Sequence, residues 1–167
     1  MDLICRSEGF SFYKDGETVI VMDNKTEKEF TLTLSPLYNM DMGTWTTVKM
    51  DGERYGINLR AKVLYDIHRK MGVGLPIFLW KNASMKIQSE TFIEYSHNDY
   101  GNFEFEITED KKLEVYYKTK DLFLEEHELC SGISIVTAFY SPLYFEVSHM
   151  NGVLLSISIL NKQGVLG

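Results

Sequence analysis

The feature that most constrains the fold is a pair of apolar and aromatic runs within Ser141–Asn161, separated by Asn151-Gly152. Asn-Gly between two such runs is among the strongest local signals for a β-hairpin. A three-residue turn that ends at Gly152 pairs Phe145 with Ile157 and segregates apolar from polar side chains, whereas a two-residue turn mixes them on each face. The sequence therefore predicts a hairpin with this register near the middle of a sheet.

The same pattern of two strand-like runs around a turn signal recurs at Asp15-Gly16, at Asp51-Gly52 and within residues 102–118. We interpret each as a further antiparallel hairpin. The expected facing pairs are Phe12 with Val19, Val19 with Leu32, Lys49 with Arg54, and Phe105 with Tyr117. All but the Lys-Arg pair bring apolar or aromatic side chains together, which favours these alignments.

One segment, Leu59–Met71, has a helical rather than a strand periodicity. Val63, Leu64 and Ile67 fall on one stripe of a helix, and Gly72 is a suitable residue to end it. We therefore expect one α-helix at Leu59–Met71.

Counting the runs gives about eleven strands and this single helix. Hairpins that follow one another without βαβ alternation predict a mainly β fold: an antiparallel β-sandwich or a partly closed barrel, with the helix over an end or edge. At 167 residues the chain is expected to form a single domain, residues 1–167.

Composition limits the cellular setting and the class of partner. The two cysteines, Cys5 and Cys130, are too few for a disulfide scaffold and suit a reducing compartment. The first residues lack the apolar run of a signal peptide, and no run of about 18 apolar residues occurs, so we expect a cytoplasmic protein. A net charge of -7 disfavours nucleic-acid or anionic-membrane binding and favours a basic protein partner.

The sequence carries no recognisable catalytic motif. The four histidines lack metal-ligand spacing, and neither a P-loop nor a nucleophile elbow is present. His97, Asp99 and Cys130 form a Cys-His-Asp group only in a fold that brings them together. We therefore expect a protein that is not an enzyme and that needs neither a cofactor nor a metal.

Acidic residues are concentrated in Glu90–Glu128. Glu104 and Glu106 alternate with phenylalanines, so a strand that buries the phenyl rings turns both carboxylates outward. Residues 120–131 are typical either of a short acidic helix or of an exposed loop. The region is interpreted as a solvated surface or as a docking surface for a cationic partner. The candidate partner-binding residues are Glu104, Glu106, Tyr116, Tyr117, Glu125, Glu126 and Glu128.

In size, acidity, β-rich pattern and the acidic Glu104–Glu128 region with Tyr116 and Tyr117, the chain resembles bacterial immunity proteins against polymorphic toxins, such as those of contact-dependent growth inhibition systems. The resemblance implies a stoichiometric inhibitor that covers a cognate basic, nuclease-type toxin. Carboxylates would then replace nucleic-acid phosphates, and tyrosines would anchor the interface. A small-ligand-binding β-barrel and an unrecognised hydrolase are the alternatives; the oligomeric state is left open.

Overall fold

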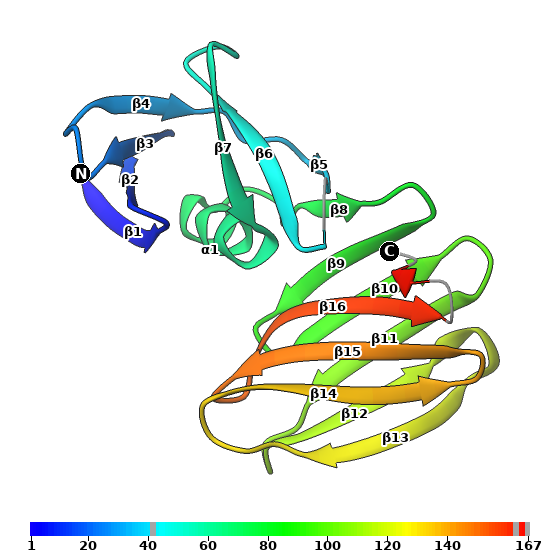
Figure 1. Cartoon of the computed structure of the whole chain (residues 1–167). Helices are drawn as coiled ribbons and strands as arrows, with labels where there is room; N and C mark the ends of the chain where they lie inside the picture. The colour runs from blue at the N-terminus through cyan, green and yellow to red at the C-terminus, as the bar shows by residue number, and fades with distance from the viewer. Residues whose placement is uncertain (41–42, 162–163, 166–167) are drawn as a thin grey trace. The chain divides into compact units, whose positions relative to one another are not determined.

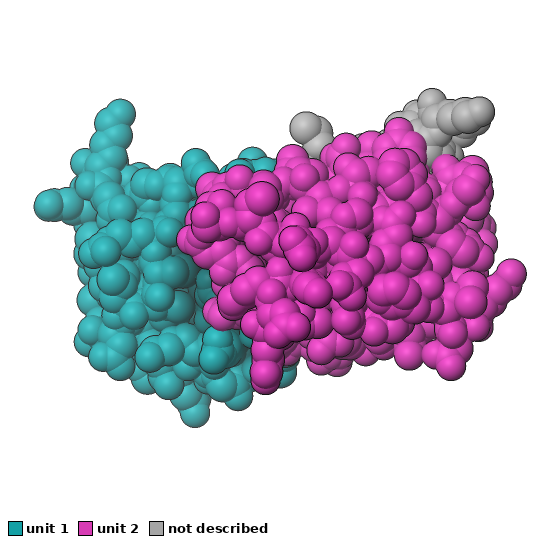
Figure 2. Space-filling view, turned by 90° about the horizontal axis from the view of Figure 1, so that it is seen from below, with its two compact units in different colours: residues 1–76 teal, residues 77–167 magenta. Residues whose placement is uncertain are grey.

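The computed structural model describes residues 1–40, 43–161 and 164–165 (Figure 1). These residues form seventeen strands in three sheets, one α-helix and a short 3-10 helix. The chain divides into two compact units, Met1–Pro76 and Ile77–Gly167 (Figure 2). The mainly β, antiparallel fold with a helix is confirmed, and the sheets are open rather than closed into a barrel. That the whole chain folds as a single domain stays a prediction.

The unit Met1–Pro76 contains a six-stranded antiparallel sheet in the order β1-β2-β3-β4-β6-β7. Its strands are β1 (Asp2–Ser7), β2 (Phe10–Asp15), β3 (Thr18–Asp23), β4 (Glu29–Leu32), β6 (Trp45–Met50) and β7 (Tyr55–Arg60). A short strand, β5 (Leu37–Asn39), precedes β6, and the Thr46 hydroxyl donates a hydrogen bond to the Asn39 carbonyl at 2.6 Å.

The helix α1 (Ala61–Met71) contacts β1, β2 and β7 of this sheet. Leu64 and Ile67 of the predicted stripe are fully buried, because the amphipathic pattern turns them toward the sheet. The helix starts two residues later than predicted, since β7 extends to Arg60. Gly72 ends it in the left-handed conformation (φ 71°), with its N–H donating to the Arg69 carbonyl.

The unit Ile77–Gly167 contains two antiparallel sheets. Six of the seven strands of sheet B belong to this unit, in the order β13-β12-β11-β10-β9-β8, and sheet C has the order β14-β15-β16-β17. The strands of sheet B are β8 (Ile77–Leu79), β9 (Ala83–Ser89), β10 (Phe92–His97), β11 (Gly101–Ile107), β12 (Lys112–Tyr117) and β13 (Leu122–Glu128), with the 3-10 helix Lys118–Lys120 between the last two. Those of sheet C are β14 (Ile133–Tyr140), β15 (Leu143–Met150), β16 (Val153–Asn161) and β17 (Gly164–Val165).

The two sheets lie face to face as a sandwich (Figure 1), and aromatic side chains join them. The ring of Phe145 in β15 lies 4.7 Å from that of Phe103 and 5.4 Å from that of Phe105, both in β11. Tyr117 and Tyr140 extend this cluster, with centroids 4.4 Å apart. Because alternate residues of each strand point inward, the opposite face of each sheet is directed outward.

The predicted hairpins are present, but four of the predicted pairings are displaced by two residues. The observed pairs are Phe12 with Val21, Lys49 with Gly56, Phe105 with Val115, and Phe145 with Ile159; Val19 pairs with Leu32 as predicted. In the central hairpin, Met150 pairs with Val153 across a two-residue turn, and a bulge between Ser148 and His149 shifts the register. The bulge restores the segregation of faces that the two-residue turn alone would lose.

Residues 120–131 are neither an acidic helix nor an exposed loop. Most of them, Leu122–Glu128, form β13, the outermost strand of sheet B. Pairing with β12 satisfies backbone N–H and C=O groups of this segment. Its many charged side chains disfavour the burial of both of its faces. This extra strand, together with β1, β5 and β17, accounts for most of the strands beyond the predicted number.

Candidate functional site

The outward side of sheet B is strongly acidic. Inward-pointing Phe103, Phe105 and Val115 are buried, so strand alternation turns the residues between them outward. The outward carboxylates come from β10, β11, β12 and β13, with two aromatic rings between them. We define the acidic face as Glu94, Glu104, Glu106, Glu114, Glu126 and Glu128 together with Tyr116 and Phe123.

Glutamates lie directly opposite one another across neighbouring strands. Glu94 pairs with Glu104, and Glu114 pairs with Glu106 on one side and with Glu126 on the other. Side chains at such positions have Cβ atoms about 4.5–5.5 Å apart, and like charges there destabilise a sheet. Repulsion among the glutamates of the acidic face therefore lowers the stability of the sheet that carries them.

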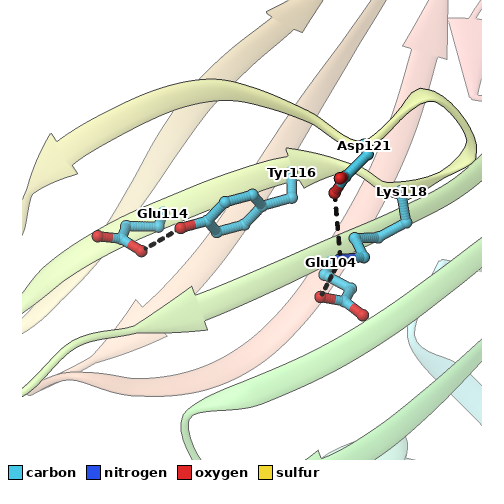
Figure 3. Close-up of polar contacts among 5 residues, drawn as sticks. All are labelled: Glu104, Glu114, Tyr116, Lys118 and Asp121. Carbon is cyan, nitrogen blue, oxygen red and sulfur yellow. Dashed lines mark hydrogen bonds and ion pairs between the residues drawn. The ribbon is translucent and has the colours of Figure 1, made fainter.

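Two lysines, Lys112 and Lys118, partly neutralise this surface, and Figure 3 shows the second of them. Lys118 Nζ lies 3.9 Å from a Glu104 oxygen and 3.8 Å from an Asp121 oxygen. Lys112 Nζ lies 3.3 Å from Glu126. These contacts are solvent-exposed and contribute little free energy, typically under about 1 kcal/mol each. The central carboxylates therefore keep most of their capacity to attract an external cation.

Tyr116 and Phe123 form an aromatic pair on the acidic face. Their ring centroids are 5.4 Å apart in an edge-on arrangement, and Phe123 is 53% exposed. The Tyr116 hydroxyl donates a 2.7 Å hydrogen bond to Glu114 (Figure 3). That bond raises the pKa of Tyr116, and nearby Glu106 and Glu126 act in the same direction. Tyr116 is therefore held as a neutral hydrogen-bond donor among carboxylates.

The structure brings together five of the seven predicted partner-binding residues. Glu104, Glu106, Tyr116, Glu126 and Glu128 share the acidic face. The remaining two point to the other side of sheet B. Their positions follow from strand alternation once the β12–β13 register is known.

Tyr117 is one of these two, and it is a core residue. Its side chain is 7% exposed and its ring lies 4.8 Å from that of Phe103. Glu125 is the other, and it pairs with buried Val115 at the edge of the sandwich. Its carboxylate accepts a 2.6 Å hydrogen bond from His127 and a 3.1 Å hydrogen bond from the backbone N–H of Phe139.

Three residues of the acidic face, Glu94, Glu114 and Phe123, were not among the sequence candidates. Glu114 alternates with apolar Leu113 and Val115, the same signal that placed Glu104 and Glu106 outward. Phe123 lies in the segment whose strand character the sequence did not indicate.

A hollow of about 330 Å³ adjoins the acidic face. Side chains from β9, β10 and β11 surround it, including Ser84, Ser96, Glu94 and Glu104. The hollow is large enough for the end of a long side chain, and its lining carries two carboxylates, Glu94 and Glu104, and two lysines, Lys86 and Lys118.

The possible Cys-His-Asp group is not assembled. The Asp99 backbone N–H, rather than its carboxylate, contacts His97, donating to Nδ1 at 3.1 Å. The strand registers place Cys130 beyond the end of β13, at the opposite end of sheet B from His97. Within the described part of the chain, no three His, Cys, Asp or Glu side chains gather in a way that would hold a metal ion.

No known family model matches this chain, and no curated protein shows significant similarity to it. Among the described residues, no helix has the length and apolar character required to cross a bilayer.

Proposed function

We propose that this protein is a binding protein whose acidic face docks against a Lys- and Arg-rich surface of a partner protein. The observation that carries the proposal is the directly opposed glutamates Glu106, Glu114 and Glu126 on three adjacent strands. Mutual repulsion lowers the stability of this arrangement in the free protein. A cationic partner relieves the repulsion on binding, so the unfavourable charge placement becomes a source of affinity.

The geometry suits guanidinium and ammonium groups. A carboxylate accepts a bidentate hydrogen bond from arginine, and several carboxylates in register offer parallel acceptors over more than one strand. Tyr116 and exposed Phe123 add an aromatic contact of the kind that anchors interfaces. The long-range field of the face would accelerate encounter with a basic protein and repel acidic ones.

A basic, nuclease-type toxin is the partner that we propose, with this chain as its immunity protein. A nuclease surface that binds nucleic acid carries lysine and arginine at phosphate positions, and the carboxylates of the acidic face would occupy those positions. Support comes from the acidic face and from the resemblance in size and charge to immunity proteins. Inhibition would be stoichiometric, because it requires only that the substrate surface be covered.

The test compares two triple variants with equal net charge. The face variant carries E106K, E114K and E126K, and the control carries the same change at exposed residues of the other unit, E8K, E17K and E53K. Tagged wild-type protein captures its partner from the native cell, and the captured protein is purified. Its association with all three forms is measured by surface plasmon resonance at two ionic strengths.

We expect the face variant to lose binding and the control to retain it, with wild-type association slowing at high salt. Purified partner should degrade nucleic acid, and one equivalent of wild-type protein should stop the reaction. Equal binding by the face variant would refute the acidic face as the interface. A partner without nuclease activity would refute the toxin assignment while leaving the interface intact.

A further inference from the structure

The strand β14 (Ile133–Tyr140) forms an outer edge of sheet C and pairs there only with β15 among the described strands. Its eight residues pair in an unbroken antiparallel register, without a bulge. Natural sheets usually protect such an edge with a charge, a proline or a bulge. None of these occurs within β14.

The outward side of β14 is apolar and accessible. Ile133 is 71% exposed, Ile135 63% and Phe139 59%. Across the ladder, Met150 lies opposite Ile133 and is also exposed. These side chains form an apolar stripe, with Thr137 between Ile135 and Phe139, on a chain that is otherwise rich in charge.

The direction of the edge amides follows from one contact. The Phe139 N–H donates to Glu125 and therefore points away from β15. In an antiparallel ladder alternate amides point the same way, so those of Ile133, Ile135 and Thr137 are also directed to the open edge. The structure gives these three amides no protein acceptor within the described residues, and unpaired N–H groups along a sheet edge are a template for pairing with another chain. They are therefore available to another strand.

The distribution of charge indicates which kind of partner would pair with the open edge of β14. Residues 131–145 contain no charged side chain, although the chain as a whole carries -7. The cationic partner proposed for the acidic face gains no electrostatic attraction here. Two carboxylates border this strand: Glu146, which lies opposite Thr137 on β15, and Glu125, which the Phe139 N–H already binds. A second copy of this chain meets no charged side chain from β14 itself, and it presents the same apolar side chains and the same free amides.

We propose that two copies of the chain associate through β14, pairing antiparallel about a two-fold axis. The register that leaves the Phe139 amide with Glu125 places Ile135 opposite Ile135 of the second copy and Ile133 opposite Thr137. Both chains then supply amides and carbonyls in equal number, as a symmetric interface requires. The isoleucines of the two copies cover one another on the outward side, and the two sheets become one continuous sheet.

The test is sedimentation equilibrium of the full chain over a range of concentrations, with the variant I135K and the control L122K. Leu122 is also an exposed apolar residue of an edge strand, in β13. We expect wild type and L122K to form dimers, and I135K to dimerise at least about tenfold more weakly. In the symmetric dimer, the lysine at position 135 of one copy would face and repel the lysine at position 135 of the other. Thermal unfolding checks that I135K is folded.

Hydrogen exchange of the wild-type amides provides a second readout that needs no variant. The amides of Ile133, Ile135 and Thr137 should exchange more slowly as the protein concentration rises, whereas the Phe139 amide should not change. A wild-type protein that stays monomeric at high concentration, or an I135K variant that dimerises as wild type does, would overturn the proposal. Concentration-independent exchange of the three amides in a dimeric protein would do so too.

Discussion

Glu125 Oε1 accepts a hydrogen bond of 3.1 Å from the backbone N–H of Phe139 and so links the edge strands of two different sheets. Strand alternation turns Glu125 to the side of sheet B that carries buried Val115, and from there its carboxylate reaches the edge of sheet C. The carboxylate replaces the strand neighbour that the Phe139 amide lacks.

Replacing Glu125 with alanine should lower the free energy of unfolding by about 1–2 kcal/mol, because it removes a charged acceptor from a backbone donor. E125Q should lose less, since its amide oxygen still accepts. E126A, one residue along and on the acidic face, is the matched control and should change stability little. Chemical denaturation measures all three. Equal losses for E125A and E126A would show that the link between the strands carries no stability.

Phe145→Ala should destabilise the protein by about 3–5 kcal/mol, and Ile157→Ala by about 2–5 kcal/mol. Both side chains are fully buried, and Phe145 packs between two phenylalanines of the facing sheet. Glu146→Ala, at an exposed position next to Phe145, should shift stability by less than about 0.5 kcal/mol. Urea denaturation provides the comparison. An unchanged midpoint for either core variant would contradict the packing of the sandwich.

Glu114→Gln should stabilise the free protein by about 0.5 kcal/mol, since Glu114 lies between two opposed glutamates. The glutamine oxygen can still accept the hydrogen bond of Tyr116, so the neutral change tests charge alone. The gain should shrink as salt screens the repulsion. Glu17→Gln, an exposed glutamate at the turn after β2, should give no gain. A lower stability of E114Q would mean that Glu114 is not destabilised by repulsion from Glu106 and Glu126.

Acidification should destabilise the fold below about pH 6.5, the ordinary pKa of histidine. Burial lowers the pKa of His149 and of His68. As the pH falls through 6.5 the unfolded chain takes up protons that the native state does not bind, so stability present above 6.5 is lost progressively.

Two variants separate the contribution of His149. H149L should flatten the decline of unfolding free energy between pH 7 and pH 5. S134A removes the hydroxyl that lies 2.5 Å from His149 Nε2 but keeps the titrating ring, so its decline should persist. Parallel pH profiles for wild type and H149L would exclude His149 as a source of the dependence.

Much of the candidate site follows from alternation along single strands. Phe103 and Phe105 are buried and Glu104 and Glu106 lie outward, as the sequence predicts. Tyr117 was misassigned although it lies in a predicted strand. It lies two residues after Val115 and therefore on the same, inward face of the strand, whereas Glu114 and Tyr116 lie on the other, so its inward direction was already contained in the pattern.

The predicted pairings of strands show the limit of this reasoning. Phe12, Lys49, Phe105 and Phe145 each have a partner two residues away from the predicted one. A shift of two keeps every side chain on its face, because the side-chain period of a strand is two. Alternation therefore determines which face a residue takes but not which residue it meets. Turn length and the bulge at Ser148 and His149 decide the partner.

The sequence by itself determined the antiparallel β class, the helix that ends before Gly72, and the outward direction of Glu104 and Glu106, since each depends on neighbours a few residues away. Only the tertiary structure decided that Leu122–Glu128 form β13, that three glutamates lie opposite one another across strands, and that Glu125 reaches Phe139. These features join residues distant in sequence. They depend on the register and sheet order that packing of the whole unit selects, and no local pattern specifies them.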